Sequence, residues 1–206
     1  MDTPHGVARA HLQPVDEPRA ALVLGHGAAG GVEAPDLVVT AEVVRSEGVS
    51  VALVEQPYRV AGRSSPAPEH RLDEAWTAVV GELAASDLNG LPLIVGGRSI
   101  GARVACRTVE ETGAVAVLCL AFPLQPPRRK GKPASPSRIE ELDRVKVPML
   151  VVQGAQDQFG MPSSGRRREV AQVPGNHSLR KDPEAVGAAV RAWLPGVVGQ
   201  PARTAT

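Results

Sequence analysis

Aromatic side chains are scarce in this chain of 206 residues, which has two tryptophans, two phenylalanines and one tyrosine. Proteins that bind single-stranded nucleic acid stack the bases on such side chains. The 23 lysines and arginines are balanced by 22 aspartates and glutamates, so no net charge attracts a polyanion. The basic runs at residues 128–132 and 166–168 are therefore interpreted as solvated loops. We expect no nucleic-acid partner.

Cysteines and long apolar runs are scarce as well. Cys106 and Cys119 fall in a predicted helix and a predicted strand, which indicates small core residues and no disulfide framework. The longest apolar stretch, residues 114–124, is shorter than the roughly 20 residues that span a bilayer. The first residues, Met-Asp-Thr-Pro-His, lack the basic and apolar regions of a signal peptide. We expect a cytoplasmic protein that does not contact the membrane.

Short apolar runs alternate with amphipathic segments, a pattern typical of a parallel sheet covered by helices on both faces. Strands are expected at residues 7–12, 20–25, 49–55, 91–97, 114–122, 148–153 and 169–173. Helices are expected at residues 35–47, 68–85, 100–111, 137–143 and 183–194, with a disordered tail at 199–206. No internal repeat or linker interrupts the pattern. It predicts one α/β domain over residues 1–198, with a doubly wound, mostly parallel sheet.

The most informative motif is Gly97-Arg98-Ser99-Ile100-Gly101, which joins a predicted buried strand to a predicted helix. A serine on such a turn has its hydroxyl pushed out of the sheet, as a nucleophile requires. The flanking glycines fit because the turn leaves no room for side chains. An incidental glycine-rich turn is the alternative. The strand before the motif and the helix after it favour a nucleophile.

A serine needs an imidazole to take its proton and a carboxylate to orient that imidazole. Asp157 comes just after the strand at 148–153, and His177 follows the last predicted strand in Gly-Asn-His-Ser. The alternative for Asp157 is an ordinary turn-capping aspartate. Ser99, Asp157 and His177 occur in the chain order of a hydrolase triad built on a sheet of this kind. We predict that they are catalytic.

The sequence Gly-His-Gly-Ala-Ala-Gly at residues 25–30 follows the first buried strand. In such a fold this loop supplies one backbone N–H of an oxyanion hole, and the residue after the nucleophile supplies the other. Ala28 and Ile100 are the expected donors. The loop also fits a dinucleotide-binding G-x-G-x-x-G, but that interpretation leaves the serine motif unexplained. Since no metal-ligand spacing occurs either, we expect no cofactor and no metal.

Tyr58, Phe122 and Phe159 each follow the carboxyl end of a predicted strand, where ligands bind in open α/β sheets. We expect them to line the substrate pocket, with ordinary packing as the alternative. Arg98 is a further candidate, because a guanidinium binds a substrate carboxylate bidentately. Its alternative role is an ion pair with an acidic residue inside the protein, such as Glu55 or Asp73.

These motifs, with residues 96–103, 118–124 and 176–178, resemble the α/β-hydrolases, in particular small capless members related to dienelactone hydrolases. The chain looks most similar to the branch that contains the hydrolase-like domain of an NSL chromatin-complex subunit and a testis-expressed homologue. The similarity runs from about Leu22 to Trp193. It implies a doubly wound sheet without a cap domain and Ser99, Asp157 and His177 as the triad. Some members of the branch lack the serine and serve as scaffolds.

The expected function is a cofactor-independent serine hydrolase that cleaves a small carboxylic ester, thioester or lactone through an acyl-enzyme on Ser99. Its partner is then a small-molecule acyl substrate. The alternative is a non-catalytic α/β-hydrolase-fold module that binds a protein partner.

One segment departs from the family pattern. Only residues 158–168 separate Asp157 from the next strand, and Pro162 and Gly165 break any helix there. A parallel crossover normally contains a helix. We therefore expect one face of the sheet to be thinly covered at this point.

Overall fold

The computed structural model describes residues 1–28, 30–126 and 136–199. In this part of the chain a seven-stranded sheet has the order β3-β5-β4-β6-β7-β8-β9. Its strands are β3 (Arg9–Gln13), β4 (Ala20–Gly25), β5 (Val49–Glu55), β6 (Leu93–Arg98), β7 (Ala116–Leu120), β8 (Met149–Gly154) and β9 (Arg168–Val173). Only β3 runs antiparallel to its neighbour. The predicted doubly wound, mostly parallel sheet is confirmed.

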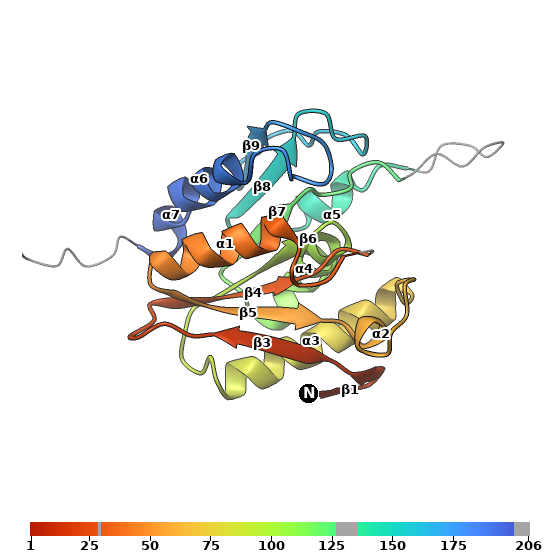
Figure 1. Cartoon of the computed structure of the whole chain (residues 1–206), viewed down its shortest axis with the longest axis vertical. Helices are drawn as coiled ribbons and strands as arrows, with labels where there is room; N and C mark the ends of the chain where they lie inside the picture. Colours follow the sequence, from red (N-terminus) through yellow and green to blue (C-terminus); the bar gives the residue numbers. More distant parts are fainter. Residues whose placement is uncertain (29, 127–135, 200–206) are drawn as a thin grey trace, which may run out of the picture.

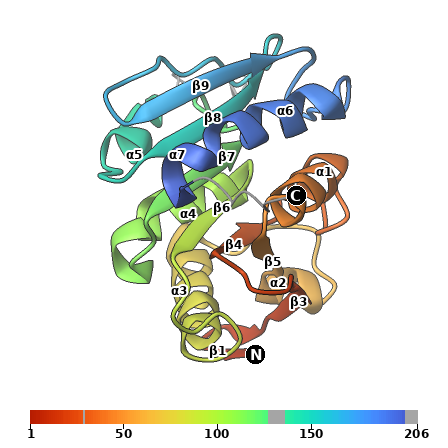
Figure 2. The same cartoon turned by 90° about the vertical axis from the view of Figure 1, so that its left-hand side faces the viewer.

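Helices cover both faces of this sheet (Figures 1 and 2). One face carries α1 (Pro35–Ser46), α6 (Pro183–Trp193) and α7 (Pro195–Val198), and the other carries α3 (Glu69–Ala85), α4 (Ile100–Thr112) and α5 (Ile139–Asp143). The predicted helices agree with these to within two residues at each end. The hairpin of β1 (Asp2–Thr3) and β2 (Gly6–Val7), the short α2 (Pro57–Val60) and α7 were not predicted. The basic run at 128–132 and the predicted tail from residue 200 lie outside the described residues.

Two hydrophobic clusters, one on each face, hold the helices against the sheet. Along β4, Leu22 and Leu24 pack on the side of α1 and α6, and Ala21 and Val23 pack on the side of α3 and α4. Successive side chains of a strand point to opposite faces, so a strand buried on both sides is apolar at every position. This is why the central strands read as continuous apolar runs rather than as alternating ones.

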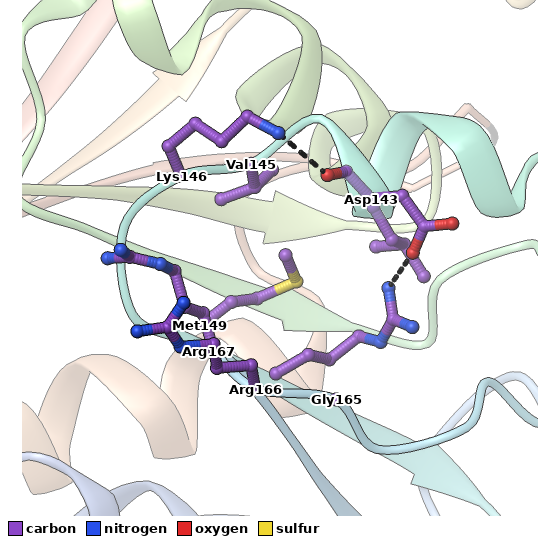
Figure 3. Close-up of a pocket in the computed structure, with 9 residues that line it drawn as sticks. Asp143, Val145, Lys146, Met149, Gly165, Arg166 and Arg167 are labelled. Atoms are coloured by element: carbon purple, nitrogen blue, oxygen red, sulfur yellow. Dashed lines mark hydrogen bonds and ion pairs between the residues drawn. The ribbon is translucent and has the colours of Figure 1, made fainter.

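The crossover from β8 to β9 contains no helix in residues 155–167, all of which the structure describes. Beside it, a hollow of about 200 Å³ opens between α5 and the first residues of β8 and β9 (Figure 3). Met149 and three consecutive arginines, 166–168, line it, and Arg168 forms an ion pair with Asp143 at 2.9 Å. The expected lack of a helix in this crossover is confirmed, and the hollow is bounded by α5. The hollow lies at the amino end of β8, whereas Asp157 follows the carboxyl end.

Candidate active site

Ser99 lies on the tight turn between β6 and α4, with φ 54° and ψ −109°. This left-handed backbone is unfavourable for a residue with a side chain, so the surrounding contacts must maintain it. The Ser99 amide donates to the carbonyl of Leu120 at 2.9 Å. A Cβ atom on Gly97 or on Gly101 would lie 2.5 Å from the carbonyl oxygen of Gly25. Both glycines are thus required by the close approach of the turn to β4.

The loop after β9 brings His177 to this turn. Its imidazole Nε2 lies 2.9 Å from Ser99 Oγ, and its Nδ1 lies 2.8 Å from Asp157 Oδ2. A ring whose Nδ1–H donates to the carboxylate has its Nε2 lone pair free to accept the serine proton. A Cβ atom on Gly154, the last residue of β8, would lie 2.5 Å from the Asn176 carbonyl oxygen. The loop reaches Ser99 because β8 ends in glycine.

The Asp157 carboxylate is almost fully buried, with a side chain 1% exposed. Besides His177 Nδ1, its Oδ2 accepts from Gln153 Nε2 at 2.8 Å, and its Oδ1 accepts from the Phe159 amide at 2.9 Å. The fully buried Gln153 amide nitrogen also lies within 3.0 Å of the carbonyls of Phe122 and Gly160. Gln153 therefore orients the carboxylate, a role that the sequence analysis missed. The only signal was a polar residue near the end of an otherwise apolar strand.

Two buried side chains, those of His26 and Tyr58, form hydrogen bonds with the loop that contains Ala28. His26 donates from Nδ1 to the Gly27 carbonyl at 2.8 Å and accepts from the Gln56 amide at Nε2. Burial lowers the pKa of His26, so this imidazole stays neutral and keeps both contacts. The Tyr58 hydroxyl donates to the Ala28 carbonyl at 3.3 Å. Burial raises the pKa of Tyr58 to about 12.

The residues predicted to line the substrate pocket have different positions. Phe159 is half-buried, and its ring meets the His177 ring edge-on at 4.5 Å between centroids. Phe122 is fully buried and Tyr58 is 4% exposed, so both pack inside the protein, which was the alternative interpretation. The Arg98 guanidinium forms an ion pair with buried Asp36 at 2.9 Å. The acids named as its partners were wrong, since Glu55 pairs with Arg9 and Asp73 with Arg107. Arg98 therefore takes its alternative role, an internal ion pair.

Neither a metal centre nor a membrane span is visible in the described ranges. Within residues 1–28, 30–126 and 136–199, no group of three or more histidine, cysteine, aspartate or glutamate side chains is arranged to hold a metal ion. In the same residues, no helix combines the length and the apolar character needed to cross a bilayer.

A mostly parallel sheet, with a serine on the turn after β6 and an aspartate and a histidine on two later loops, defines the α/β-hydrolase fold. The chain belongs to the alpha/beta hydrolase domain family, since the sequence model of that family matches residues 18–181. A search of curated protein sequences found no match. The resemblance to the branch of the NSL subunit stays a prediction.

Solved structures share the whole fold at low sequence identity. Est1E from Butyrivibrio proteoclasticus with bound ferulic acid has a TM-score of 0.73 and 17% identity over 94% of this chain and 96% of its own. XC6422 from Xanthomonas campestris, a serine hydrolase without a lid, has a TM-score of 0.69 and 19% identity over 94% and 93%. Dienelactone hydrolase from Anabaena variabilis has a TM-score of 0.68 and 16% identity over 90% and 88%.

Proposed function

We propose that the protein is a serine hydrolase that cleaves a small carboxylic ester, thioester or lactone. The observation that carries the proposal is the continuous hydrogen-bonded chain from Ser99 through His177 to Asp157, with contacts of 2.9 and 2.8 Å. Its serine has a positive φ of 54°, an energetically unfavourable conformation of the kind that is often found at functional sites. The similarity to esterases and to a dienelactone hydrolase supports the same reaction class.

The reaction begins when the Ser99 oxygen attacks the substrate carbonyl and His177 Nε2 takes the hydroxyl proton. Asp157 stabilises the imidazolium that forms. The tetrahedral intermediate collapses as His177 protonates the leaving alkoxide or thiolate, which leaves an acyl group on Ser99. Water, deprotonated by the same imidazole, then attacks the acyl carbon. The bond between that carbon and Ser99 Oγ breaks as His177 returns the proton to the serine oxygen, and the acid is released.

The oxyanion of the intermediate is stabilised by the backbone amides of Ala28 and Ile100 in this proposal. Ile100 is the first residue of α4, and the first amides of a helix have no partner inside it. In the described part of the chain, no hydrogen bond joins either amide to another residue. Both groups are therefore available to a negatively charged oxygen.

An open site suits small or exposed acyl groups. XC6422, which shares the fold, is described as lacking a lid, and the described residues of this chain form no separate cap over the sheet. We therefore expect acetyl and butyryl esters to be cleaved faster than long-chain esters, which need an enclosed apolar tunnel. Faster cleavage of laurate than of acetate esters would contradict this part of the proposal.

The test is labelling of the native protein with a fluorophosphonate probe, followed by mass mapping of the labelled peptide. We expect labelling at Ser99 that is lost on heat denaturation and in Ser99→Ala. Ser86→Ala, which changes an exposed serine at the end of α3, is the matched control and should label like the wild type. A folded wild type that neither labels nor hydrolyses p-nitrophenyl acetate would favour the non-catalytic interaction module.

A further inference from the structure

Arg98 is the last residue of β6 and directly precedes Ser99. Its guanidinium contacts three segments that come from distant parts of the chain. Nε pairs with Asp36 Oδ2 in the first turn of α1 at 2.9 Å, and one terminal nitrogen donates to the His177 carbonyl at 3.1 Å. The other terminal nitrogen packs against the loop after β4, since it would lie 2.6 Å from a Cβ atom on Gly27.

Two of these contacts reach the parts of the site that must be aligned, and the third, with Asp36, holds the guanidinium in place. The His177 carbonyl belongs to the residue whose imidazole faces Ser99, so the hydrogen bond restrains that loop by its backbone. Gly27 directly precedes Ala28, the proposed oxyanion donor. A planar guanidinium makes all three contacts at once because its donors lie in a fixed fork. A lysine ammonium is a single point of charge and cannot bridge the same distances.

Asp36 is the anchor of this arrangement. Its side chain is fully buried, whereas the Arg98 side chain is 17% exposed. Burial raises the pKa of Asp36, and the charge of Arg98 opposes that rise. A buried ion pair adds little stability compared with apolar packing of the same volume, because both charges lose their hydration. Stability alone therefore does not explain why this ion pair is present.

We propose that Arg98, anchored by Asp36, is a positioning residue that aligns the loop of His177 and the loop of Ala28 with the Ser99 turn. This inference rests on the proposed hydrolase function for its catalytic consequence. Its structural part, the restraint of two loops by one side chain, is measurable without any substrate. Arg98 touches no reacting atom, so it acts through the backbone of its neighbours.

The experiment compares Arg98→Met, Arg98→Lys and the double variant Arg98→Met/Asp36→Asn with the wild type. Hydrolysis of p-nitrophenyl acetate gives kcat and KM, and hydrogen exchange is followed in the peptides that cover His177 and Ala28. Because displacement of a catalytic group by about 1 Å costs roughly a hundredfold in rate, we expect kcat to fall about ten- to hundredfold in Arg98→Met. KM should change little, and both peptides should exchange faster.

The double variant separates positioning from stability. Arg98→Met leaves a buried carboxylate without its partner, which destabilises the fold, and the added Asp36→Asn removes that charge. We expect the double variant to regain thermal stability while kcat and the fast exchange stay unrestored. Arg98→Lys should keep the charge balance and recover only part of kcat, because it cannot hold both Asp36 and the His177 carbonyl.

Arg107→Met is the matched control. Arg107 lies on α4, pairs with Asp73 on α3, and has the same side-chain exposure of 17%. It should lower thermal stability without changing kcat or the exchange of the His177 peptide.

Unchanged kcat and unchanged exchange in Arg98→Met would overturn the proposal. So would full recovery of kcat in the double variant, which would reduce the role of Arg98 to stability. A loss confined to the KM of anionic esters would instead assign Arg98 to substrate binding. If the wild type hydrolyses no ester, the proposed function fails, while the exchange of the His177 peptide still decides whether Arg98 restrains that loop.

Discussion

Gly154, the last residue of β8, packs against the backbone of the loop that carries His177. Its replacement by alanine would therefore displace that loop. The added Cβ atom would lie 2.5 Å from the Asn176 carbonyl oxygen and 2.7 Å from that of Gly175. Both contacts are with backbone, so no side chain can rotate away to make room. The loop must withdraw by about 0.9 Å to reach the 3.4 Å at which ordinary contact begins, and overpacking of this kind forces such backbone shifts.

A shift of this size acts on stability and on rate to different extents. Overpacking of this kind costs about 1–3 kcal/mol of unfolding free energy, which lowers Tm by about 2–4 °C per kcal/mol in a chain of this length. The same displacement lengthens the 2.9 Å contact between His177 Nε2 and Ser99 Oγ. We therefore expect kcat to fall about ten- to hundredfold, while the protein stays folded at 25 °C.

The assay is hydrolysis of p-nitrophenyl acetate together with thermal unfolding by circular dichroism. Gly81→Ala is the matched control, because a Cβ atom there meets no atom within 4 Å and the residue is solvent-exposed in the middle of α3. It should add about 0.5–1 kcal/mol of stability and leave kcat unchanged. A Gly154→Ala variant with wild-type kcat would refute the argument that this glycine sets the position of His177.

Three further predictions concern other buried groups. Asp157→Ala should lower kcat about 10³- to 10⁴-fold, because the imidazole loses its orienting acceptor; a loss below tenfold in the esterase assay would contradict this role. Tyr58 is the one tyrosine of the chain, so a tyrosinate absorbance titration of the folded protein should give a pKa near 12 and that of the unfolded chain about 10. The unfolded state then loses its proton first, and about 2–3 kcal/mol of stability should disappear as pH rises from about 10 to 12, a loss that should be absent in Tyr58→Phe. The buried thiols of Cys106 and Cys119 should react with Ellman's reagent only after denaturation, and rapid reaction of the native protein would show that the core near α4 opens readily.

Local sequence patterns were sufficient for most of the fold. The strands β4 and β8 are apolar at nearly every position, whereas an exposed strand has polar residues at alternate positions. Their burial therefore follows from the hydrophobic effect. The glycines around Ser99 mark a turn in which only small residues fit, and this determines where the serine stands. The order of Ser99, Asp157 and His177 then follows from the chain itself.

Contacts between distant segments were beyond the reach of those patterns. Arg98 and Asp36 are far apart in the chain, and the sequence contains many other acidic residues that could pair with Arg98. The choice is made by the packing of α1 against the sheet, which buries one carboxylate beside the guanidinium. The burial of Tyr58 and Phe122 has a similar cause, since a residue just past a strand can face either the pocket or the core.

The sequence by itself determined the mostly parallel sheet and the serine turn, because apolar periodicity and the placement of glycines are local properties. The order of the candidate catalytic residues is read directly from the chain. Only the tertiary structure decided that Gln153 orients Asp157 and that Arg98 reaches Asp36 and the His177 carbonyl. Each of these depends on which groups are excluded from water together, and that is settled only when the distant segments pack.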